Sequence, residues 1–356
     1  MRNPVLKMIH PRLVKGMHGI TRWLAVEMNG RPRTLYIEVT LRCNAKCDFC
    51  SYWHQPKMSE LEEYESVVRK IKPLSVIITG GEPLVRKDLD IVIRGIKREK
   101  PLIISLLTNG YLLNTQKAEA LLESGLDTIS ISLNHIGAEQ DKERHIEGLF
   151  SHLLQVVPDL SGIGFKRVNL NTVILNNNLD EIIDIVHLAE KWGVGVSFSS
   201  YSSSKADNHS YEIEERKLHK LEELLHKLQD LKKNGAPIEN SSWYLEHMME
   251  FYRTGRVKGK CGAGRKTIHV TPDGRLKPCP DFPAKIQYDS YAPNWVEKLD
   301  CDSCWYACRG EVEAPITPQR ALYFLKMWQK KSTVPLERPM NEPDNRLKNR
   351  IFSQNQ

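Results

Sequence analysis

The sequence predicts an α/β protein with a partial, TIM-like (β/α)6 barrel followed by a small cysteine-rich domain. Six short apolar runs alternate with amphipathic helical stretches that start about every 25 to 40 residues, as βαβ units require. A serine-rich segment at 199–204 then interrupts the alternation. The eight cysteines form two groups, at 43–50 and at 261–308. Clumped thiols of this kind are more typical of metal binding than of disulfides.

The predicted strands are mostly apolar, as strands buried on both faces should be. They cover residues 35–40, 75–79, 102–107, 128–133, 168–175 and 194–199. The predicted helices between them cover residues 60–72, 87–98, 116–124 and 179–192. In parallel sheets, chemistry gathers at the carboxyl ends of the strands. Motifs that directly follow a strand therefore identify the candidate site.

Five segments follow from this pattern. They are an N-terminal helical segment at 1–34, the barrel at 35–204, a helical connector at 205–259, the cysteine-rich domain at 260–331 and a C-terminal tail at 332–356. Residues 11–28 have one apolar helical face, which we expect either to cover the barrel or to lie on an anionic membrane surface. Leucines at helical spacing predict a packed helix over 213–233. Thr271–Gly274 predicts a tight hairpin turn.

Composition excludes several classes of protein. The 356 residues are 40% hydrophobic and 27% charged, with a net charge of +7, which is typical of a folded globular chain. No apolar run reaches the length of a membrane span, and the N-terminus lacks the pattern of a signal peptide. We therefore expect a cytoplasmic protein. No basic patch with interleaved aromatic residues stands out, so no nucleic-acid partner is expected.

The first cysteine group directly follows the first predicted strand. Cys43, Cys47 and Cys50 form a CxxxCxxC motif. Three thiolates can hold a [4Fe-4S] cluster and leave one iron open to an exogenous ligand. With His54 they would instead make a Cys3His set suited to structural zinc. The thiols alone leave both alternatives open.

A glycine-rich motif follows the second predicted strand, at Thr79–Leu84. Gly80 and Gly81 allow the backbone to approach a ligand closely, and Glu82 can accept a cationic amine. We expect this motif at the same edge of the sheet as the three cysteines.

In this order the two motifs resemble those of the radical S-adenosylmethionine (radical SAM) superfamily, from about residue 35 to 200. The resemblance implies a [4Fe-4S] cluster on the three cysteines, with the amine and carboxylate of SAM on the open iron. An electron from the cluster would cleave SAM to methionine and a 5′-deoxyadenosyl radical, which takes hydrogen from a substrate. The implied cofactor-binding residues are Phe49, Gly80, Gly81, Glu82, Pro83, Asn109, Ser132, Asn134 and Asn171. Family members frequently carry Asp and Gly where this chain has Asn134 and His135.

The second cysteine group consists of Cys261, Cys279, Cys301, Cys304 and Cys308. A zinc ribbon would need paired CxxC motifs, whereas this group has one. Beside a radical SAM core, the pattern looks like the SPASM and twitch extensions, which hold auxiliary [4Fe-4S] clusters. Cys261, Cys279 and two of the other three would be its ligands, and the cluster would transfer electrons or bind substrate.

The sequence therefore predicts a radical SAM enzyme with one auxiliary cluster, reduced by a flavodoxin- or ferredoxin-like partner. We expect a small-molecule or lipid substrate. The alternatives are a peptide-modifying radical SAM enzyme and a non-catalytic zinc or iron-sulfur module. Only 42 residues precede Cys43, whereas peptide-modifying relatives commonly carry a leader-binding domain there. The sequence assigns no catalytic residue beyond the cofactor-binding set.

Overall fold

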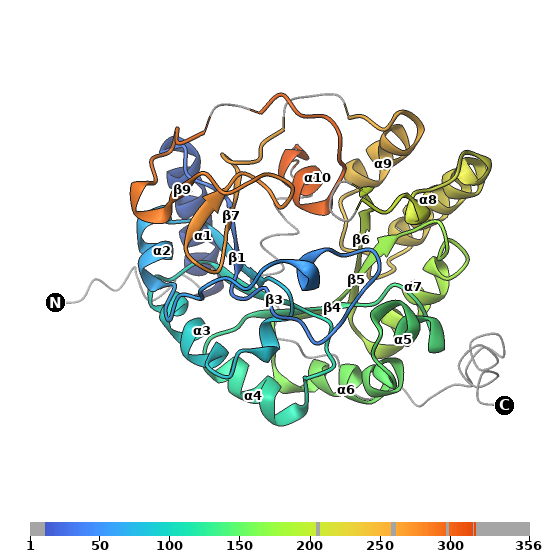
Figure 1. The fold of residues 1–356 in the computed structure, drawn as a ribbon, viewed down its shortest axis with the longest axis horizontal. Coiled ribbons are helices and arrows are strands. Elements are labelled where there is room, and N and C mark those ends of the chain that lie inside the picture. Colours follow the sequence, from blue (N-terminus) through green and yellow to red (C-terminus); the bar gives the residue numbers. More distant parts are fainter. Residues whose placement is uncertain (1–10, 204–206, 258–260, 297–298, 316, 318–356) are drawn as a thin grey trace.

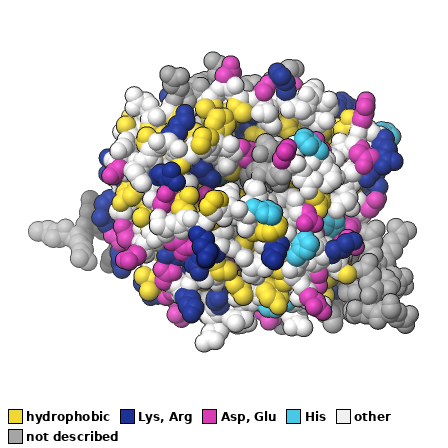
Figure 2. All heavy atoms as spheres, viewed as in Figure 1, with side chains coloured by type: hydrophobic (Ala, Val, Ile, Leu, Met, Phe, Trp, Pro, Cys, Tyr) yellow, Lys and Arg dark blue, Asp and Glu magenta, His cyan; other side chains and the backbone are white. Residues whose placement is uncertain are grey.

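The structure, a computed structural model, describes residues 11–203, 207–257, 261–296, 299–315 and 317 (Figure 1). The predicted tail at 332–356 lies outside these ranges. Within them, no helix combines the length and the hydropathy that a membrane crossing requires. Figure 2 shows acidic and basic side chains interspersed over the face that Figure 1 presents.

Six parallel strands form the main part of one sheet. They are β1 (Thr34–Glu38), β2 (Ser75–Thr79), β3 (Ile103–Thr108), β4 (Thr128–Ser132), β5 (Arg167–Ile174) and β6 (Gly195–Ser200). The sheet curves into an incomplete ring with helices around its outside (Figure 1). The predicted partial barrel is confirmed, and every predicted strand overlaps an observed one.

The helices between these strands cover the outer face of the sheet. They are α2 (Glu65–Ile71), α3 (Leu89–Arg98), α4 (Thr115–Glu123), α5 (Ala138–Arg144), α6 (Leu149–Ile163) and α7 (Ile182–Trp192). The predicted helix at 60–72 was too long at its start, because residue 61 instead donates its backbone N–H to the carbonyl of Pro272 at 2.8 Å. The helices α5 and α6 were not predicted, since Gly148 and Pro158 interrupt their pattern.

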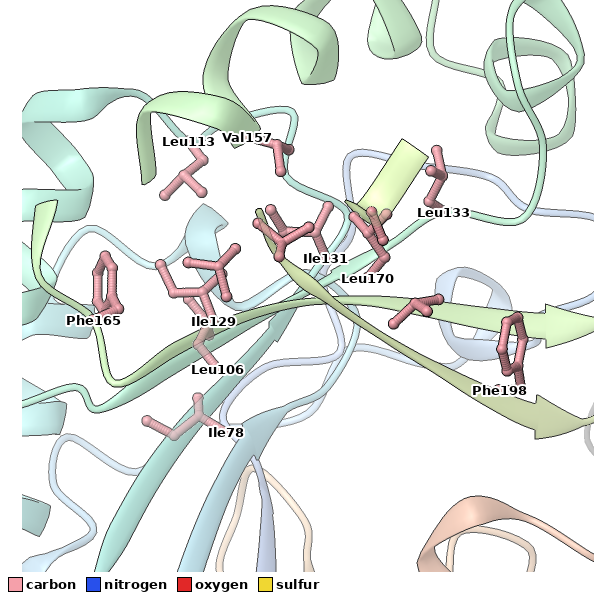
Figure 3. Packing of buried hydrophobic residues seen from close by; sticks show 14 of the residues in the cluster. Ile78, Leu106, Leu113, Ile129, Ile131, Leu133, Val157, Phe165, Leu170 and Phe198 are labelled. Atoms are coloured by element: carbon pink, nitrogen blue, oxygen red, sulfur yellow. The ribbon is translucent and has the colours of Figure 1, made fainter. Parts of the chain in front are cut away.

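The core lies between the sheet and this layer of helices. Along each strand the fully buried side chains alternate with partly exposed ones. Figure 3 shows buried residues from neighbouring strands, among them Leu106, Ile129, Ile131 and Leu170, packed into one cluster. The partly exposed side chains point to the opposite face, which is the inside of the barrel.

The cysteine-rich region extends the same sheet at its other edge. The strand β7 (Thr267–Val270) pairs with β1 in parallel, and β8 (Arg275–Lys277) and β9 (Ile286–Gln287) follow in antiparallel order. The sheet order is thus β6-β5-β4-β3-β2-β1-β7-β8-β9. The barrel was expected to end near residue 204, and β6 is indeed an edge strand; the pairing of β7 with β1, across more than two hundred residues of chain, was not predicted. The predicted turn is present, with Gly274 at a φ of 84°.

The remaining elements lie outside the alternation of strands and helices. They are α1 (Pro11–Met28), α8 (Leu218–Lys233), α9 (Ser242–Thr254) and α10 (Ala307–Glu313), and the short 3-10 turns η2 (Tyr52–His54), η3 (Pro83–Val85), η5 (His209–Tyr211), η6 (Glu215–Lys217) and η7 (Tyr288–Ser290). The predicted helix at 11–28 matches α1. Ile20 and Leu24 of its predicted apolar face are exposed, so contact with a membrane surface stays a prediction.

Candidate functional site

The first three cysteines lie in the loop that follows β1, which passes over the middle of the ring in Figure 1. Cys47 is buried, and Cys43 and Cys50 are partly exposed. Burial raises the pKa of Cys43 to about 12, and the neighbouring Glu82, Cys47 and Cys50 add to this. A cation has to replace the protons before such thiols become ligands at neutral pH. The donor set therefore fits a positively charged metal cluster.

The glycines at the end of β2 let the backbone pack directly on this cysteine loop. The N–H of Gly81 donates to the carbonyl of Thr40 at 2.8 Å, and the N–H of Glu82 donates to that of Arg42 at 2.9 Å. A Cβ at Gly81 would lie 2.6 Å from the carbonyl oxygen of Leu41, and one at Gly80 would overlap Thr40. The structure thus shows a close approach to the chain's own loop, and the expected close approach to a ligand stays a prediction.

Glu82 connects the ends of β2 and β3. Its side chain is buried, and its carboxylate accepts hydrogen bonds from Thr108 Oγ1 at 2.7 Å, the N–H of Asn109 at 2.7 Å and the N–H of Leu84 at 3.0 Å. Burial raises its pKa although these donors oppose the change. Asn109 Nδ2 in turn donates to Asn44 Oδ1 in the cysteine loop at 2.8 Å. Glu82 and Asn109 thus hold the loop against the strand ends.

Arg144 is a member of the site that sequence reasoning missed. It is buried, with Nη1 3.6 Å from Cys47 Sγ and the guanidinium 4.8 Å from the ring centre of Phe49. Phe49 also meets Tyr211 edge-on, with ring centres 6.0 Å apart. Nothing in the sequence distinguishes Arg144 from the other arginines, since only the fold brings it to Cys47.

A buried polar network continues from Arg144. Asn134 is fully buried, donates from Nδ2 to Glu143 at 2.9 Å and accepts from the N–H of Val173 at 3.0 Å. His135 lies between Glu143 at 3.3 Å and Glu181 at 2.9 Å. Burial alone would lower the pKa of His135, but the two carboxylates outweigh it and raise the pKa to about 9. The side chain of Asn134, predicted to bind cofactor, is here committed to the chain itself.

The other predicted cofactor-binding residues lie at the same strand ends. Pro83 is buried and begins η3. Ser132 ends β4 and is partly exposed inside the barrel. Asn171 of β5 accepts a hydrogen bond from Ser197 of β6, with 3.4 Å between Oδ1 and Oγ. The structure therefore gathers all the predicted residues at one end of the barrel, and their contacts with a cofactor stay a prediction.

A cleft of about 470 Å³ lies beside the cysteine loop. Cys47, Cys50, Trp53 and His54 line it together with Tyr211. Within the part of the chain that the structure describes, no three thiols, imidazoles or carboxylates converge as ligands of one metal ion.

The five C-terminal cysteines face one cavity of about 240 Å³, as the sequence grouping predicts. Burial raises the pKa of Cys279 to about 12, and Asp281, Cys304 and Cys261 contribute. Burial also raises the pKa of Cys261, with a contribution from Cys301. These mutual effects show that the thiols lie close to one another. They fit a compact metal cluster as a donor set.

A second feature that the sequence analysis missed lies inside the barrel. Glu38 of β1 is 1% exposed, and its Oε1 accepts a hydrogen bond from Tyr52 at 2.6 Å and pairs with Lys277 Nζ at 2.7 Å. His269 Nδ1 is 4.0 Å from the same oxygen, and its ring stacks on Tyr36 at 4.5 Å. The available signal was a single carboxylate in the apolar run of β1.

Comparisons with known proteins agree with this geometry. Residues 37–189 match the Radical SAM superfamily. The GTP 3',8-cyclase of Aquifex aeolicus (strain VF5) is 33% identical over 182 residues, which span 48% of this chain and 56% of that protein. The enzyme of the same name from Clostridium botulinum (strain Hall) is 26% identical over 282 residues, 73% of this chain and 85% of that protein.

The fold has solved counterparts as well. The crystal structure of Streptococcus suis SuiB bound to S-adenosylmethionine superposes with a TM-score of 0.59 at 18% identity, and the match covers 77% of this chain and 68% of that one. At this identity the likeness concerns the fold. The solved structure thus supports the fold, and the family match over residues 37–189 supports the predicted radical SAM class with its SAM cofactor and [4Fe-4S] cluster.

Proposed function

We propose that this chain is a radical SAM enzyme that abstracts hydrogen from a small molecule, and that Cys43, Cys47 and Cys50 hold its catalytic cluster. When bound, the cluster supplies the electron that cleaves SAM to methionine and the 5′-deoxyadenosyl radical. The observation that carries this proposal is the pair of backbone hydrogen bonds from Gly81 and Glu82 to the start of the cysteine loop. They join the cysteine motif to the glycine-rich motif, and both motifs lie within the matched residues 37–189.

The chain's own residues would hold and shield this site. Glu82 and Asn109 fix the loop on the strand ends. Arg144 places a buried positive charge beside Cys47, which stabilises thiolates and anionic groups nearby. The helices around the ring cover the outer face of the sheet and so leave its inner face as the side where the chemistry would take place.

We further propose that the C-terminal cysteines hold an auxiliary iron-sulfur cluster, with Cys261, Cys279, Cys301 and Cys304 as ligands. Cys301 contributes to the raised pKa of Cys261, and Cys304 and Cys261 contribute to that of Cys279, which supports this choice. Cys308 lines the same cavity and also lies close enough to Tyr36 inside the barrel to raise the tyrosine pKa, after burial. The fifth thiol thus lies on the barrel side of the group.

The partner and substrate follow from charge and from the relatives. A net charge of +7 suits an acidic reductant of the flavodoxin or ferredoxin type. The relatives named GTP 3',8-cyclase make GTP the first substrate to test.

The test is anaerobic reconstitution followed by counting iron and sulfide and by measuring 5′-deoxyadenosine after addition of dithionite, SAM and GTP. We expect two clusters per chain and release of 5′-deoxyadenosine. Cys47→Ala should abolish the release. Glu82→Ala should weaken SAM binding because it removes the hydrogen bond to Asn109 that helps to hold the cysteine loop on the strand ends. Lys233→Met, which removes an exposed ion pair with Asp230, serves as the matched control. A preparation that holds only zinc and leaves SAM intact would contradict the proposal.

A further inference from the structure

The inner face of the barrel is reached by solvent. On β1 to β6 the outward side chains are almost completely buried, and the alternating inward ones are partly exposed. Most of the partly exposed side chains carry hydroxyl or amide groups: Thr34, Tyr36, Ser75, Thr79, Ser105, Ser130, Ser132, Asn171, Ser197 and Ser199. Arg167 begins β5, and the apolar members are Ile77, Ile103, Leu107 and Val173. A filled barrel core would instead be lined by large apolar side chains.

Polar side chains on this inner face form hydrogen bonds between neighbouring strands. Thr128 donates to Ser105 at 2.6 Å, and Asn169 Nδ2 donates to Ser197 at 2.8 Å. Asn169 Oδ1 is buried and has no hydrogen-bond partner. An apolar chain in this space would leave hydroxyl and amide groups unpaired, whereas a polar molecule would satisfy them. The lining therefore selects for hydrogen-bonding ligands, of which SAM, expected at Ser132 and Asn171, is one; the end of the lining away from these two residues remains for a substrate.

One end of this lining carries a paired acid and base. Tyr36 and Glu38 share a face of β1, and the sheet register places His269 beside Tyr36 and Lys277 beside His269. Lys277 reaches across to Glu38, and its side chain is 9% exposed. An ammonium has three N–H donors, of which the pair with Glu38 uses one.

This pair lies between the two cysteine groups. Tyr52, which hydrogen-bonds Glu38, follows Cys50 by two residues along the chain. Lys277 precedes Cys279 by two residues along the chain. A molecule bound against Glu38 and Lys277 is thus next to both groups.

We propose that the barrel binds a compact polar molecule rich in hydroxyl or amine groups, and that Glu38 and Lys277 anchor one of these groups. A carboxylate that accepts and an ammonium that donates recognise a group that does both, as a hydroxyl or an amine does. The pair is neutral overall, so it does not favour a bare anion. The inference rests on the proposed radical SAM function, and it replaces the lipid alternative with a sugar-like or nucleoside-like substrate class.

The test compares three fractions of an extract from cells that make the protein: the low-molecular-weight aqueous fraction, the peptide fraction, and the lipid fraction dispersed as vesicles. Each is added to reconstituted enzyme with SAM. Two signals are measured, the rise in Tm and the additional 5′-deoxyadenosine. We expect both signals from the low-molecular-weight aqueous fraction. Signals from the lipid or peptide fraction alone, or from none of the three, would overturn the substrate class.

Variants then test the anchor. Lys277→Met and Glu38→Gln should each raise the amount of the aqueous fraction that gives a half-maximal rise in Tm. The expected increase is roughly ten- to hundredfold, as the loss of a hydrogen bond to a charged group produces. The double variant Glu38→Gln/Lys277→Met removes both charges and so avoids a lone buried charge. It should fold, carry wild-type amounts of iron, and still fail to respond. Lys233→Met is the control.

The two proposals fail in different ways. If the Tm rise depends on Lys277 while no sample yields 5′-deoxyadenosine, the anchor stands and the radical function falls. If 5′-deoxyadenosine forms and the double variant responds like the wild type, the function stands and the anchor is refuted.

Discussion

Replacing His135 by Gln tests the buried network behind the cysteine loop. His135 is 2% exposed, and Glu143 and Glu181 contact it on either side. Burial opposes its protonation, yet the carboxylates raise the pKa from 6.5 to about 9. At about 1.4 kcal/mol per unit of pKa, this preference for the charged form is worth about 3 kcal/mol of folding stability.

The sign of the pH dependence follows from the raised pKa. A group that binds its proton more tightly in the folded state stabilises that state fully below its unfolded pKa. Its contribution is therefore complete below pH 6.5 and declines as the pH rises through about 9. The wild-type free energy of unfolding should fall by about 3 kcal/mol across this window because of His135. His135→Gln should lack that fall.

The assay is urea unfolding of both proteins at several pH values across this window. His209→Gln is the matched control, because His209 also pairs with a carboxylate, Glu212 at 3.0 Å, but is exposed. Exposed pairs contribute little to stability, so its profile should follow the wild type. Parallel profiles for wild type and His135→Gln would refute the reasoning.

Three further predictions concern the two cysteine groups. Gly81→Ala forces a Cβ against the carbonyls of the cysteine loop and should lower the amount of iron bound by the first group. In the control Gly162→Ala, the added Cβ has no neighbouring atom within 4 Å, so the bound iron should be retained. A colorimetric iron assay measures both variants. Arg144→Met should lower the reduction potential of the first cluster, because the reduced form loses a nearby positive charge; an EPR-monitored redox titration that shows no change would contradict this. Cys304→Ser should lose auxiliary-cluster iron and Cys308→Ser should keep it, and the reverse result would exchange their roles.

Local patterns were sufficient to predict the barrel and the position of its motifs. Buried parallel strands are apolar runs bounded by turns, so β2 was predicted with its observed bounds. The cysteine and glycine motifs each follow a strand, and parallel strands bring their carboxyl ends together. This is why Cys43 and Gly81 could be placed side by side without a structure.

Features that depend on contacts distant in sequence were missed. Nothing near β7 indicates that it pairs with β1, because the partner is far along the chain. In the sequence, Arg144 and Lys277 cannot be told from ordinary surface residues. The structure shows that Arg144 is buried beside Cys47 and Lys277 beside Glu38. The predicted role of the glycines was also incomplete, because it did not include packing of their backbone against the cysteine loop. That packing depends on the two strands being adjacent.

The central claim is that the three-cysteine cluster keeps one iron for SAM. The most direct measurement is electron-nuclear double resonance of the reduced, reconstituted protein with SAM labelled isotopically at its amine and carboxylate. We expect hyperfine coupling from both labelled groups, and its loss in Cys47→Ala. A reduced cluster whose spectrum is the same with and without SAM would contradict it.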